Sequence, residues 1–214
     1  MKIIAIGAHI DDIELGAGGL LADAALKHHV VKMIIMSKSG YSDFSGKVSR
    51  TNEQAQKEGI AAARTLGITD CEILDFPIKS IPYSAEPVEA LDRIITLYKP
   101  DLIITQWPYD THQDHRNTAL STISAARYYN NILMYEPIWP SGRSYQGFRG
   151  QLYYRVSRSA VTKKTNAIKQ HKSQHNKYGE PWVNTVTARG MFRGGEVGCA
   201  YAECFEVVRW ELKL

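Results

Sequence analysis

The sequence predicts an α/β fold: a Rossmann-like, doubly wound, mostly parallel sheet with helices on both faces. Short apolar runs rich in isoleucine and valine alternate with longer segments whose apolar residues recur at helical spacing. Short connections between them favour right-handed crossovers and a parallel sheet that is covered on both faces. The chain of 214 residues, without an internal repeat or a linker, is expected to form a single domain over residues 1–214.

Five strands and four helices are predicted in the first two-thirds of the chain. Gly67 is placed as the C-cap of one helix, and Pro100 stands just past the end of another. The strands are predicted at Lys2–Gly7, Val30–Ser37, Cys71–Leu74, Asp101–Thr105 and Asn131–Tyr135, and the helices at Leu15–His28, Ser49–Leu66, Ser84–Tyr98 and Arg116–Tyr129.

The last third of the chain is less regular, and we expect it to be an appendage to the same domain. Strands are predicted at Leu152–Val156 and Glu203–Trp210, and a helix is predicted at Thr162–Lys177. The segment Ala188–Gly195 is rich in glycine and arginine and carries no clear periodic pattern.

The composition is that of an ordinary globular protein, with 44% apolar and 22% charged residues. The net charge of +4 is far from that of a nucleic-acid-binding protein; it could attract an anionic substrate, although a few extra surface lysines explain it more simply.

No apolar run approaches the ~18 residues of a membrane helix, and no signal peptide is visible. Three cysteines, read as core residues, favour a reducing compartment. We therefore expect a cytoplasmic protein without nucleic-acid partners or a membrane span; a homo-oligomer is compatible with the sequence.

Two clusters of histidine and aspartate follow the first and the fourth predicted strands. Residues 8–16 read AHIDDIELG, and residues 110–115 read DTHQDH. With the common strand order 3-2-1-4-5, strands one and four are neighbours and the order reverses between them. Doubly wound sheets bind ligands outside the carboxyl ends of the strands at this point. The two clusters are therefore expected to face one crevice.

The residue types in this crevice indicate a metal ion. Unpaired carboxylates and imidazoles at such density would be costly, and a divalent cation removes that cost. Imidazole with carboxylate is typical of catalytic zinc, which keeps one coordination position open for water. His9 and Asp12 can chelate from one turn, one histidine of the second cluster completes the set, and Asp11 can accept a proton from water.

The same residues also allow structural interpretations. Asp11 and Asp12 could cap the following helix, and Asp114 and His115 could be a first-turn acid and a structural histidine. Both alternatives weaken because the two clusters fall at the ends of strands expected to be adjacent. The glycines of residues 16–19 resemble a dinucleotide motif, but they lie inside the predicted helix, where they permit close approach to the sheet.

At these residues the sequence resembles the PIG-L/LmbE-like family of zinc-dependent amino-sugar N-deacetylases. The family pattern AHPDDxExGxGG followed by HxDH appears here as AHIDDIELGAGG and HQDH, with Ile10 and Gln113 in place of two loop-shaping prolines. Three weaker matches extend the region of resemblance to about residues 3–209. They are Arg50-x-x-Glu53, His171-Lys172-Ser173-Gln174 and Tyr201-Ala202-Glu203-x-Phe205.

The resemblance implies a role for each matched position. His9, Asp12 and His115 match zinc ligands, Asp11 matches the general base, and His112 matches the residue that stabilises the oxyanion or protonates the leaving amine. Asp114 matches the group that orients His112. The implied activity removes an N-acetyl group from an amino sugar or its conjugate and releases acetate and an amine. One Zn²⁺ per chain is expected, with iron or another divalent ion left open.

Candidates for binding a small-molecule amino-sugar substrate, nucleotide-linked or not, are Arg50, Tyr109, Arg189 and Arg193. The guanidinium of Arg50 offers forked donors, but a surface arginine at a helix start is an equal alternative. The arginines at 189 and 193 could face an anionic leaving portion, although surface solvation is the expected account of either one alone. Trp107 and Tyr109 flank the second cluster and could stack on a sugar ring, in competition with core packing at a strand end. His171 and His175 are expected to be an exposed helical pair rather than metal ligands.

Two other function classes remain. The chain could be a non-catalytic sugar- or nucleotide-sugar-binding Rossmann-like protein with a vestigial metal site, although the intact ligand set and Asp11 argue against this. It could also be a metal-dependent hydrolase of another amide or of a phosphoester. A two-metal phosphoesterase would need additional bridging carboxylates, which are not evident.

Overall fold

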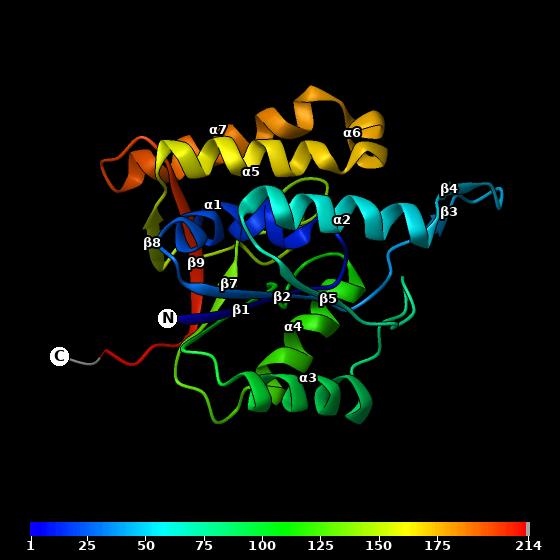
Figure 1. Ribbon diagram of the computed structural model, residues 1–214, viewed down its shortest axis with the longest axis horizontal. Helices are drawn as coiled ribbons and strands as arrows, with labels where there is room; N and C mark the ends of the chain where they lie inside the picture. The colour runs from blue at the N-terminus through cyan, green and yellow to red at the C-terminus, as the bar shows by residue number, and fades with distance from the viewer. Residues whose placement is uncertain (213–214) are drawn as a thin grey trace.

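A computed structural model describes residues 1–212 of the chain and shows a central sheet with helices on both sides of it (Figure 1). Seven strands of the described part form the sheet, in the order β5-β2-β1-β6-β7-β9-β8. The strands are β1 (Lys2–Gly7), β2 (Val30–Ile35), β5 (Asp70–Ile73), β6 (Leu102–Thr105), β7 (Ile132–Tyr135), β8 (Leu152–Arg155) and β9 (Ala202–Arg209). A separate hairpin pairs β3 (Tyr41–Ser42) with β4 (Val48–Arg50).

The strand order confirms the predicted fold class. The five parallel strands β5, β2, β1, β6 and β7 stand in the order 3-2-1-4-5, counted along the five predicted strands. The order reverses between β1 and β6, whose register pairs Ile3 with Leu102. β9 runs antiparallel to both β7 and β8, so the last third of the chain extends the same sheet. The carboxyl ends of β1 and β6 therefore lie side by side, as expected.

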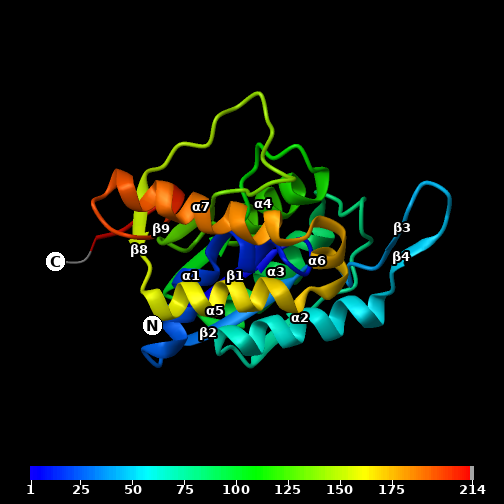
Figure 2. The same cartoon turned by 90° about the horizontal axis from the view of Figure 1, so that it is seen from above.

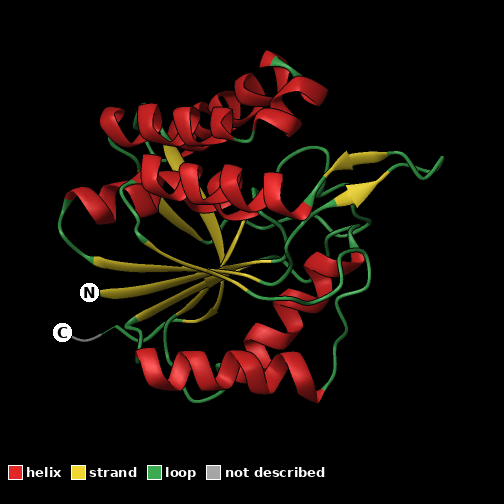
Figure 3. Cartoon of the chain, turned by 45° about the vertical axis from the view of Figure 1, so that its right-hand side comes forward, coloured by secondary structure: helices red, strands yellow, loops and turns green. Residues whose placement is uncertain are grey.

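Helices cover both faces of the sheet (Figure 3). One face packs against α1 and α2 through a core containing Ile13, Leu21 and Leu66, and α5 lies over these two helices. The opposite face packs against α3 and α4 through a core containing Ile4, Leu91 and Ile95. The helices are α1 (Asp12–Leu26), α2 (Asn52–Leu66), α3 (Ala85–Tyr98), α4 (Gln113–Ala125), α5 (Arg158–Gln170), α6 (Lys172–Tyr178) and α7 (Glu180–Glu196).

The glycines of α1 allow this helix to lie close to its neighbours, as the sequence predicts. A Cβ atom added at Gly16 would stand 2.2 Å from the ring of Tyr135 at the end of β7, and one added at Gly19 would meet Val156 and Glu203. Such separations are far below van der Waals contact, so side chains at these positions would push the helix away. The close approach brings the start of α1, which follows the first His/Asp cluster, against β7.

Glu203 on β9 anchors the middle of α1. Its carboxylate accepts hydrogen bonds from the backbone N–H groups of Gly19 and Leu20, each at 2.7 Å, and pairs with Nζ of Lys164 at 2.6 Å. All of these groups are buried. The C-terminal Tyr-Ala-Glu-x-Phe motif thus has a structural explanation: its glutamate joins α1, α5 and β9.

Several predicted boundaries were wrong. Residues 48–50 belong to strand β4, and α2 begins only after Thr51, whose hydroxyl caps the helix by accepting from the N–H of Gln54. The helix predicted at Thr162–Lys177 is broken at His171 into α5 and α6. The Gly/Arg-rich segment 188–195 is not irregular but lies within α7. Gly67 is the predicted C-cap, with φ of 94° in the left-handed region.

The hairpin β3–β4 and α6 stand at the end of the molecule to which β1 and β2 point (Figure 1). The chain between β7 and β8 forms a long loop that arches away from the helices when the molecule is seen from above (Figure 2). In the part of the chain that is described, no helix has the length and apolar character needed to cross a bilayer. Cys204 is buried, Cys71 is half-buried and packs against the core, and Cys199 is half-buried; all three are free thiols.

Candidate metal centre and active site

The two His/Asp clusters meet at the adjacent carboxyl ends of β1 and β6. The first lies in the turn from β1 into α1, and the second lies in the turn from β6 into α4, where His112 is the N-cap residue. Nδ1 of His9 lies 3.0 Å from Nε2 of His115, although 106 positions separate the two residues in sequence. Side chains of the two clusters therefore form one compact group.

Carboxylates behind the two histidines fix which ring nitrogens carry hydrogen. Nε2 of His9 lies 2.9 Å from Oδ2 of Asp114, and Nδ1 of His115 lies 3.0 Å from Oδ2 of Asp110. A carboxylate only accepts, so in each neutral ring the nitrogen that faces it carries the proton. The two nitrogens that face each other, Nδ1 of His9 and Nε2 of His115, then both present lone pairs.

Asp12 adds carboxylate oxygens to these lone pairs. Its Oδ2 lies 3.5 Å from Nδ1 of His9, and its Oδ1 lies 3.3 Å from Nε2 of His115. Oδ2 also accepts hydrogen bonds from the N–H of His9 at 2.8 Å and from Nε2 of Gln106 at 2.9 Å. Three electron-pair donors thus converge without an intervening proton in the neutral state. This donor set fits a divalent cation, with room in its coordination for other ligands.

The pKa values of the cluster show that it requires positive charge. Burial lowers the pKa of His9, but hydrogen bonds to Asp114 and Asp12 outweigh this effect and raise it to about 10. Burial raises the pKa of Asp12, but the charge of His115 and the hydrogen bond from His9 hold it below its usual range. In the protein without a cation, a protonated imidazole therefore supplies the charge that a cation would supply.

His112 adjoins this group as a neutral imidazole. A ligand nitrogen of His112 lies within 4.8 Å of those of His9 and His115. Its Nδ1 accepts the backbone N–H of Asp114 at 3.2 Å, which leaves the ring proton on Nε2. Burial and the charges of His9 and His115 lower the pKa of His112 to about 4. His112 is therefore a hydrogen-bond donor at neutral pH rather than an imidazolium.

The carboxylate of Asp114 contacts His9 and not the residue that the resemblance implies. Besides His9, it accepts the backbone N–H groups of Lys79 at 2.6 Å and Ile81 at 3.0 Å. Only the backbone of Asp114 contacts His112. The expectation that the Asp114 side chain orients His112 is corrected accordingly: it orients His9.

Asp11 occupies the N-cap position of α1, but its side chain makes no capping hydrogen bond. It is half-buried and lines the cavity in front of His9 and His115. Burial and the neighbouring charge of Asp12 raise its pKa, and the charge of Arg50 opposes this rise. The helix-capping alternative for Asp11 therefore fails, and its carboxylate is free to act on a bound molecule.

A cavity of about 260 Å³ opens in front of the cluster, slightly smaller than the ~300–1,000 Å³ typical of small-ligand sites. It is lined by polar residues of both clusters and by aromatic residues from the hairpin, the loop after β6 and the α6–α7 region. Besides His9, Asp11, Asp12, His112 and His115, they include Tyr41, Arg50, Lys79, Gln106, Trp107, Asp110, Tyr135, Glu136, Lys177, Tyr178 and Trp182.

Of the four residues predicted to bind substrate, Arg50 alone lines this cavity among the residues described. It is buried, and its Nε donates to the carbonyl of Ser39 at 3.0 Å. Tyr109 instead borders a neighbouring hollow and is 44% exposed. Its ring contacts that of Trp107, at 5.5 Å between centroids, and Trp107 reaches the cavity. The Trp107 side chain is only 2% exposed, so core packing rather than a free stacking face describes it.

Arg189 and Arg193 bind a carboxylate of the protein rather than standing free to face a substrate. Nε and Nη2 of Arg193 contact the two oxygens of Glu136 at 2.9 Å and 2.6 Å, and Nη1 of Arg189 contacts Oε1 at 3.0 Å. Arg193 is buried, so the expectation of surface solvation was wrong for it. Glu136, directly after β7, lines the cavity. The two arginines therefore hold a cavity residue in place.

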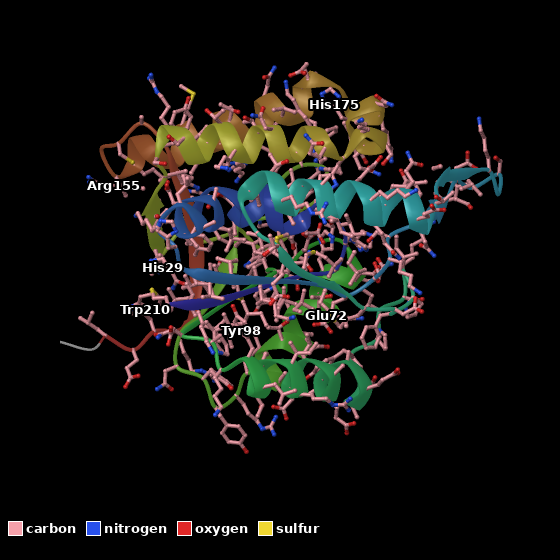
Figure 4. The ribbon with its side chains drawn as sticks, in the orientation of Figure 1. His29, Glu72, Tyr98, Arg155, His175 and Trp210 are labelled. Carbon is pink, nitrogen blue, oxygen red and sulfur yellow. The ribbon has the colours of Figure 1, made fainter. Side chains whose placement is uncertain are left out.

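His171 and His175 are not an exposed pair. His171 is fully buried, and its Nε2 lies 3.3 Å from Oε1 of Glu14, the glutamate of the first motif. His175 lies on α6 near the surface (Figure 4), with Nε2 3.2 Å from Oε1 of Glu180. His171, which precedes the Ser-Gln segment, thus links the start of α6 to the start of α1.

Sequence reasoning did not single out Gln106 and Glu136, and it gave Asp110 no role. Gln106 and Glu136 directly follow the carboxyl ends of two parallel strands, and Asp110 lies shortly after one of them. The carboxyl ends of parallel strands are where this fold builds sites. That positional signal could have found them, since Gln106 follows β6 and Glu136 follows β7 without an intervening residue.

Comparison with known proteins agrees with this geometry. The profile of the family PIG-L, described as GlcNAc-PI de-N-acetylase, matches residues 4–126, which is more than half of the chain. The chain belongs to the PIG-L family. This PIG-L protein is 32% identical over 177 residues to the uncharacterized deacetylase YaiS of Escherichia coli K12, across 80% of this chain and 90% of YaiS. It is 25% identical over 219 residues to the diacetylchitobiose deacetylase of Thermococcus kodakarensis, across 94% of this chain and 81% of that protein.

Similarity of structure extends to an enzyme of another kind. GalB, the 4-carboxy-2-hydroxymuconate hydratase of Pseudomonas putida KT2440, has a TM-score of 0.82 and 19% identity over all of this chain and 98% of GalB. Likeness at this level of identity shows the fold alone, and one fold can host different reactions. The reaction of the PIG-L protein therefore has to be argued from its own residues.

Proposed function

We propose that this PIG-L protein is a metal-dependent N-deacetylase, which removes the acetyl group from the nitrogen of an amino sugar or its conjugate. The observation that carries the proposal is the pair of inward-facing imidazole nitrogens, 3.0 Å apart, beside Asp12 and a free Asp11 carboxylate. The deacetylase names of the two relatives, one of which acts on diacetylchitobiose by name, support acetylated sugars as the substrate class.

His9, Asp12 and His115 are the residues that would hold the cation. Two imidazoles and one carboxylate suit Zn²⁺ and also suit iron, and we propose Zn²⁺ as the first choice. When bound, such a cation supplies Lewis acidity, which lowers the pKa of water and polarises an acyl carbonyl. Asp114 and Asp110 hold the two imidazoles in the tautomers that direct their lone pairs inward.

Asp11 acts as the base. Its carboxylate accepts a proton from the attacking water, while the water oxygen forms the new bond to the acyl carbon. The raised pKa of Asp11, caused by burial and by Asp12, makes the same group able to give that proton to the amide nitrogen as the C–N bond breaks. The products are acetate and the free amine, and Asp11 is returned to its initial state.

His112 stabilises the negative charge on the carbonyl oxygen. Because its Nδ1 accepts from the backbone of Asp114, the Nε2–H is the donor available to a bound molecule. A fixed donor directed at a developing oxyanion typically contributes ~10²–10³ in rate. The lowered pKa of His112 means that it would fill this role as a neutral donor rather than as an imidazolium.

A direct test is acetate release from N-acetylglucosamine and N,N′-diacetylchitobiose by the purified protein, by the protein treated with a chelator, and after Zn²⁺ or Fe²⁺ is restored. We expect release that chelation abolishes and metal restores. Asp11→Asn should keep the metal and lower kcat by ~10²–10⁴. If the intact protein binds these sugars without releasing acetate, the alternative of a non-catalytic binding protein with a vestigial site gains instead.

A further inference from the structure

We infer that the end of the cavity around Tyr41 is a subsite for an anionic group, a phosphate or a carboxylate, carried by the substrate. The inference rests on the proposed deacetylase function, and it narrows the substrate class to acidic conjugates of an amino sugar. We call the group formed by Tyr41, Arg50, Lys79 and Lys177 the Tyr41 subsite; all four residues line the cavity.

Three cationic side chains surround one aromatic ring in this subsite. The guanidinium carbon of Arg50 lies 5.7 Å from the centroid of the Tyr41 ring, and the Nζ atoms of Lys79 and Lys177 lie 6.0 Å and 5.4 Å from it. The four residues come from both strands of the hairpin, from the loop before α3 and from α6. Segments that are far apart in sequence thus bring positive charge to one end of the cavity.

Interaction with the ring does not by itself account for this arrangement. A cation beside a tyrosine gains only ~0.5–1 kcal/mol at an exposed site, and the three positive charges repel one another. Lys79 and Lys177 are exposed lysines; Nζ of Lys79 also donates to the carbonyl of Ser42 at 3.2 Å, and Nζ of Lys177 also lies 4.8 Å from the centroid of the Tyr178 ring. Together with Arg50 they place three positive charges within 6.0 Å of one ring centroid at the cavity, where they would attract an anionic group of a ligand.

The guanidinium of Arg50 has unused hydrogen-bonding capacity. The side chain is 4% exposed, its Nε donates to the carbonyl of Ser39, and its Nη1 is buried without a partner within the described residues. A buried donor without an acceptor costs free energy, and the cost is larger for a charged group. An oxyanion in the cavity offers the planar pair of acceptors that a guanidinium matches.

The acidic residues that line the cavity are already committed elsewhere. Asp12 and Asp110 contact the two metal-site histidines, and Glu136 contacts two arginines from α7. Asp11 is the proposed base, and its charge also acts on Arg50. Lys79 and Lys177, however, form no ion pair with a carboxylate among the described residues, so their counter-charge is left to the ligand, and a neutral sugar such as diacetylchitobiose does not provide it.

The test compares binding of three sugars to metal-loaded Asp11→Asn protein by calorimetry. The probes are N-acetylglucosamine, N-acetylglucosamine 1-phosphate and N-acetylmuramic acid, which are neutral, phosphorylated and carboxylated. We expect at least one charged sugar to bind about tenfold or more tightly than the neutral one, as a well-placed charge-assisted contact provides. The preferred probe identifies phosphate or carboxylate as the anion.

Variants of α6 separate the Tyr41 subsite from binding of the anion to the metal. Lys177→Gln should reduce the preference for the charged sugar several-fold and leave affinity for N-acetylglucosamine nearly unchanged. Lys172→Gln, an exposed lysine on the same helix that is not among the described cavity residues, should change neither. Equal binding of neutral and charged sugars, or a preference that survives in Lys177→Gln, would overturn the inference.

Acetate release by the unaltered enzyme distinguishes a failure of this inference from a failure of the proposed function. Release from all three sugars with equal kcat/KM would contradict the anionic subsite and uphold the deacetylase. A Lys177-dependent preference in binding, without acetate release from any of the three sugars, would uphold the subsite and contradict the deacetylase.

Discussion

Nδ1 of His9 and Nε2 of His115 face each other across 3.0 Å, and a carboxylate stands behind each ring on its opposite nitrogen. Two neutral imidazoles so held cannot hydrogen-bond to each other, because both facing nitrogens carry lone pairs. A cation or a shared proton must lie between them. The same feature links the fold, which brings β1 and β6 together, to the chemistry proposed for the site.

Asp114→Asn should weaken metal binding although Asp114 is not expected to touch the metal. An amide offers a single acceptor oxygen where the carboxylate now accepts from His9, Lys79 and Ile81, so the tautomer and orientation of His9 lose their support. We expect affinity for Zn²⁺ to fall by ~10–100-fold, measured by competition with a chromogenic chelator. Asp75→Asn, at an exposed carboxylate, is the control; an unchanged affinity in Asp114→Asn would refute the orienting role.

Metal affinity should rise with pH. The pKa of His9 is raised to about 10, so at neutral pH the protein without metal holds a proton that a cation must displace. Each unit of pH between 7 and 9 should therefore increase the apparent affinity by about tenfold, with release of about one proton per cation. Calorimetry in buffers of different ionisation enthalpy counts the protons. An affinity that is flat over this range would show that His9 is already deprotonated.

Two substitutions of His112 should separate its catalytic role from its capping role. His112→Asn retains a side-chain acceptor for the N–H of Asp114 but loses the donor at Nε2, so kcat should fall by ~10²–10³ while stability is kept. His112→Ala should lose the same activity and, in addition, about 1 kcal/mol of unfolding free energy from the cap of α4. Both variants should retain the metal. Near-normal kcat in His112→Asn would exclude oxyanion stabilisation by this residue.

Glycine-to-alanine substitutions in two helices should change stability in opposite directions. Gly16→Ala would place a methyl group 2.2 Å from the Tyr135 ring and should destabilise the protein by about 1–3 kcal/mol. Gly195→Ala, in α7, meets no atom within 4 Å and should stabilise it by up to about 1 kcal/mol. Denaturant unfolding measures both. A Gly16→Ala protein as stable as the wild type would contradict the close approach of α1 to β7.

The strand order could be predicted because apolar runs and a common topology are sufficient to define it. Five runs of β-type residues in alternation with helices leave few arrangements, and placing the two clusters after strands one and four required no tertiary detail. The hairpin β3–β4 and the break between α5 and α6 were missed because their cause is not periodic. The hairpin depends on the pairing of β3 with β4 across a loop, and the helix break depends on the buried contact of His171 with Glu14.

The site could be predicted as a set of residues but not as a set of contacts. Nothing in the spacing of Asp114 distinguishes a partner at His112, two residues away, from one at His9, 105 residues away. Likewise, the Gly/Arg-rich composition around Arg193 suggested solvent exposure, whereas its partner Glu136 follows a strand that is remote in sequence. Long-range polar pairs depend on the packing of whole elements, which local patterns do not encode.

The most direct test of the central claim is the metal content of the purified protein and of His115→Ala, measured by plasma mass spectrometry after dialysis against Zn²⁺ and then against metal-free buffer. The donors of His9, Asp12 and His115 predict about one cation per chain in the wild type and a nearly empty site in the variant, which should still be folded by circular dichroism. A wild-type protein that releases acetate without any bound cation, or a His115→Ala protein that retains a full equivalent, would contradict the account.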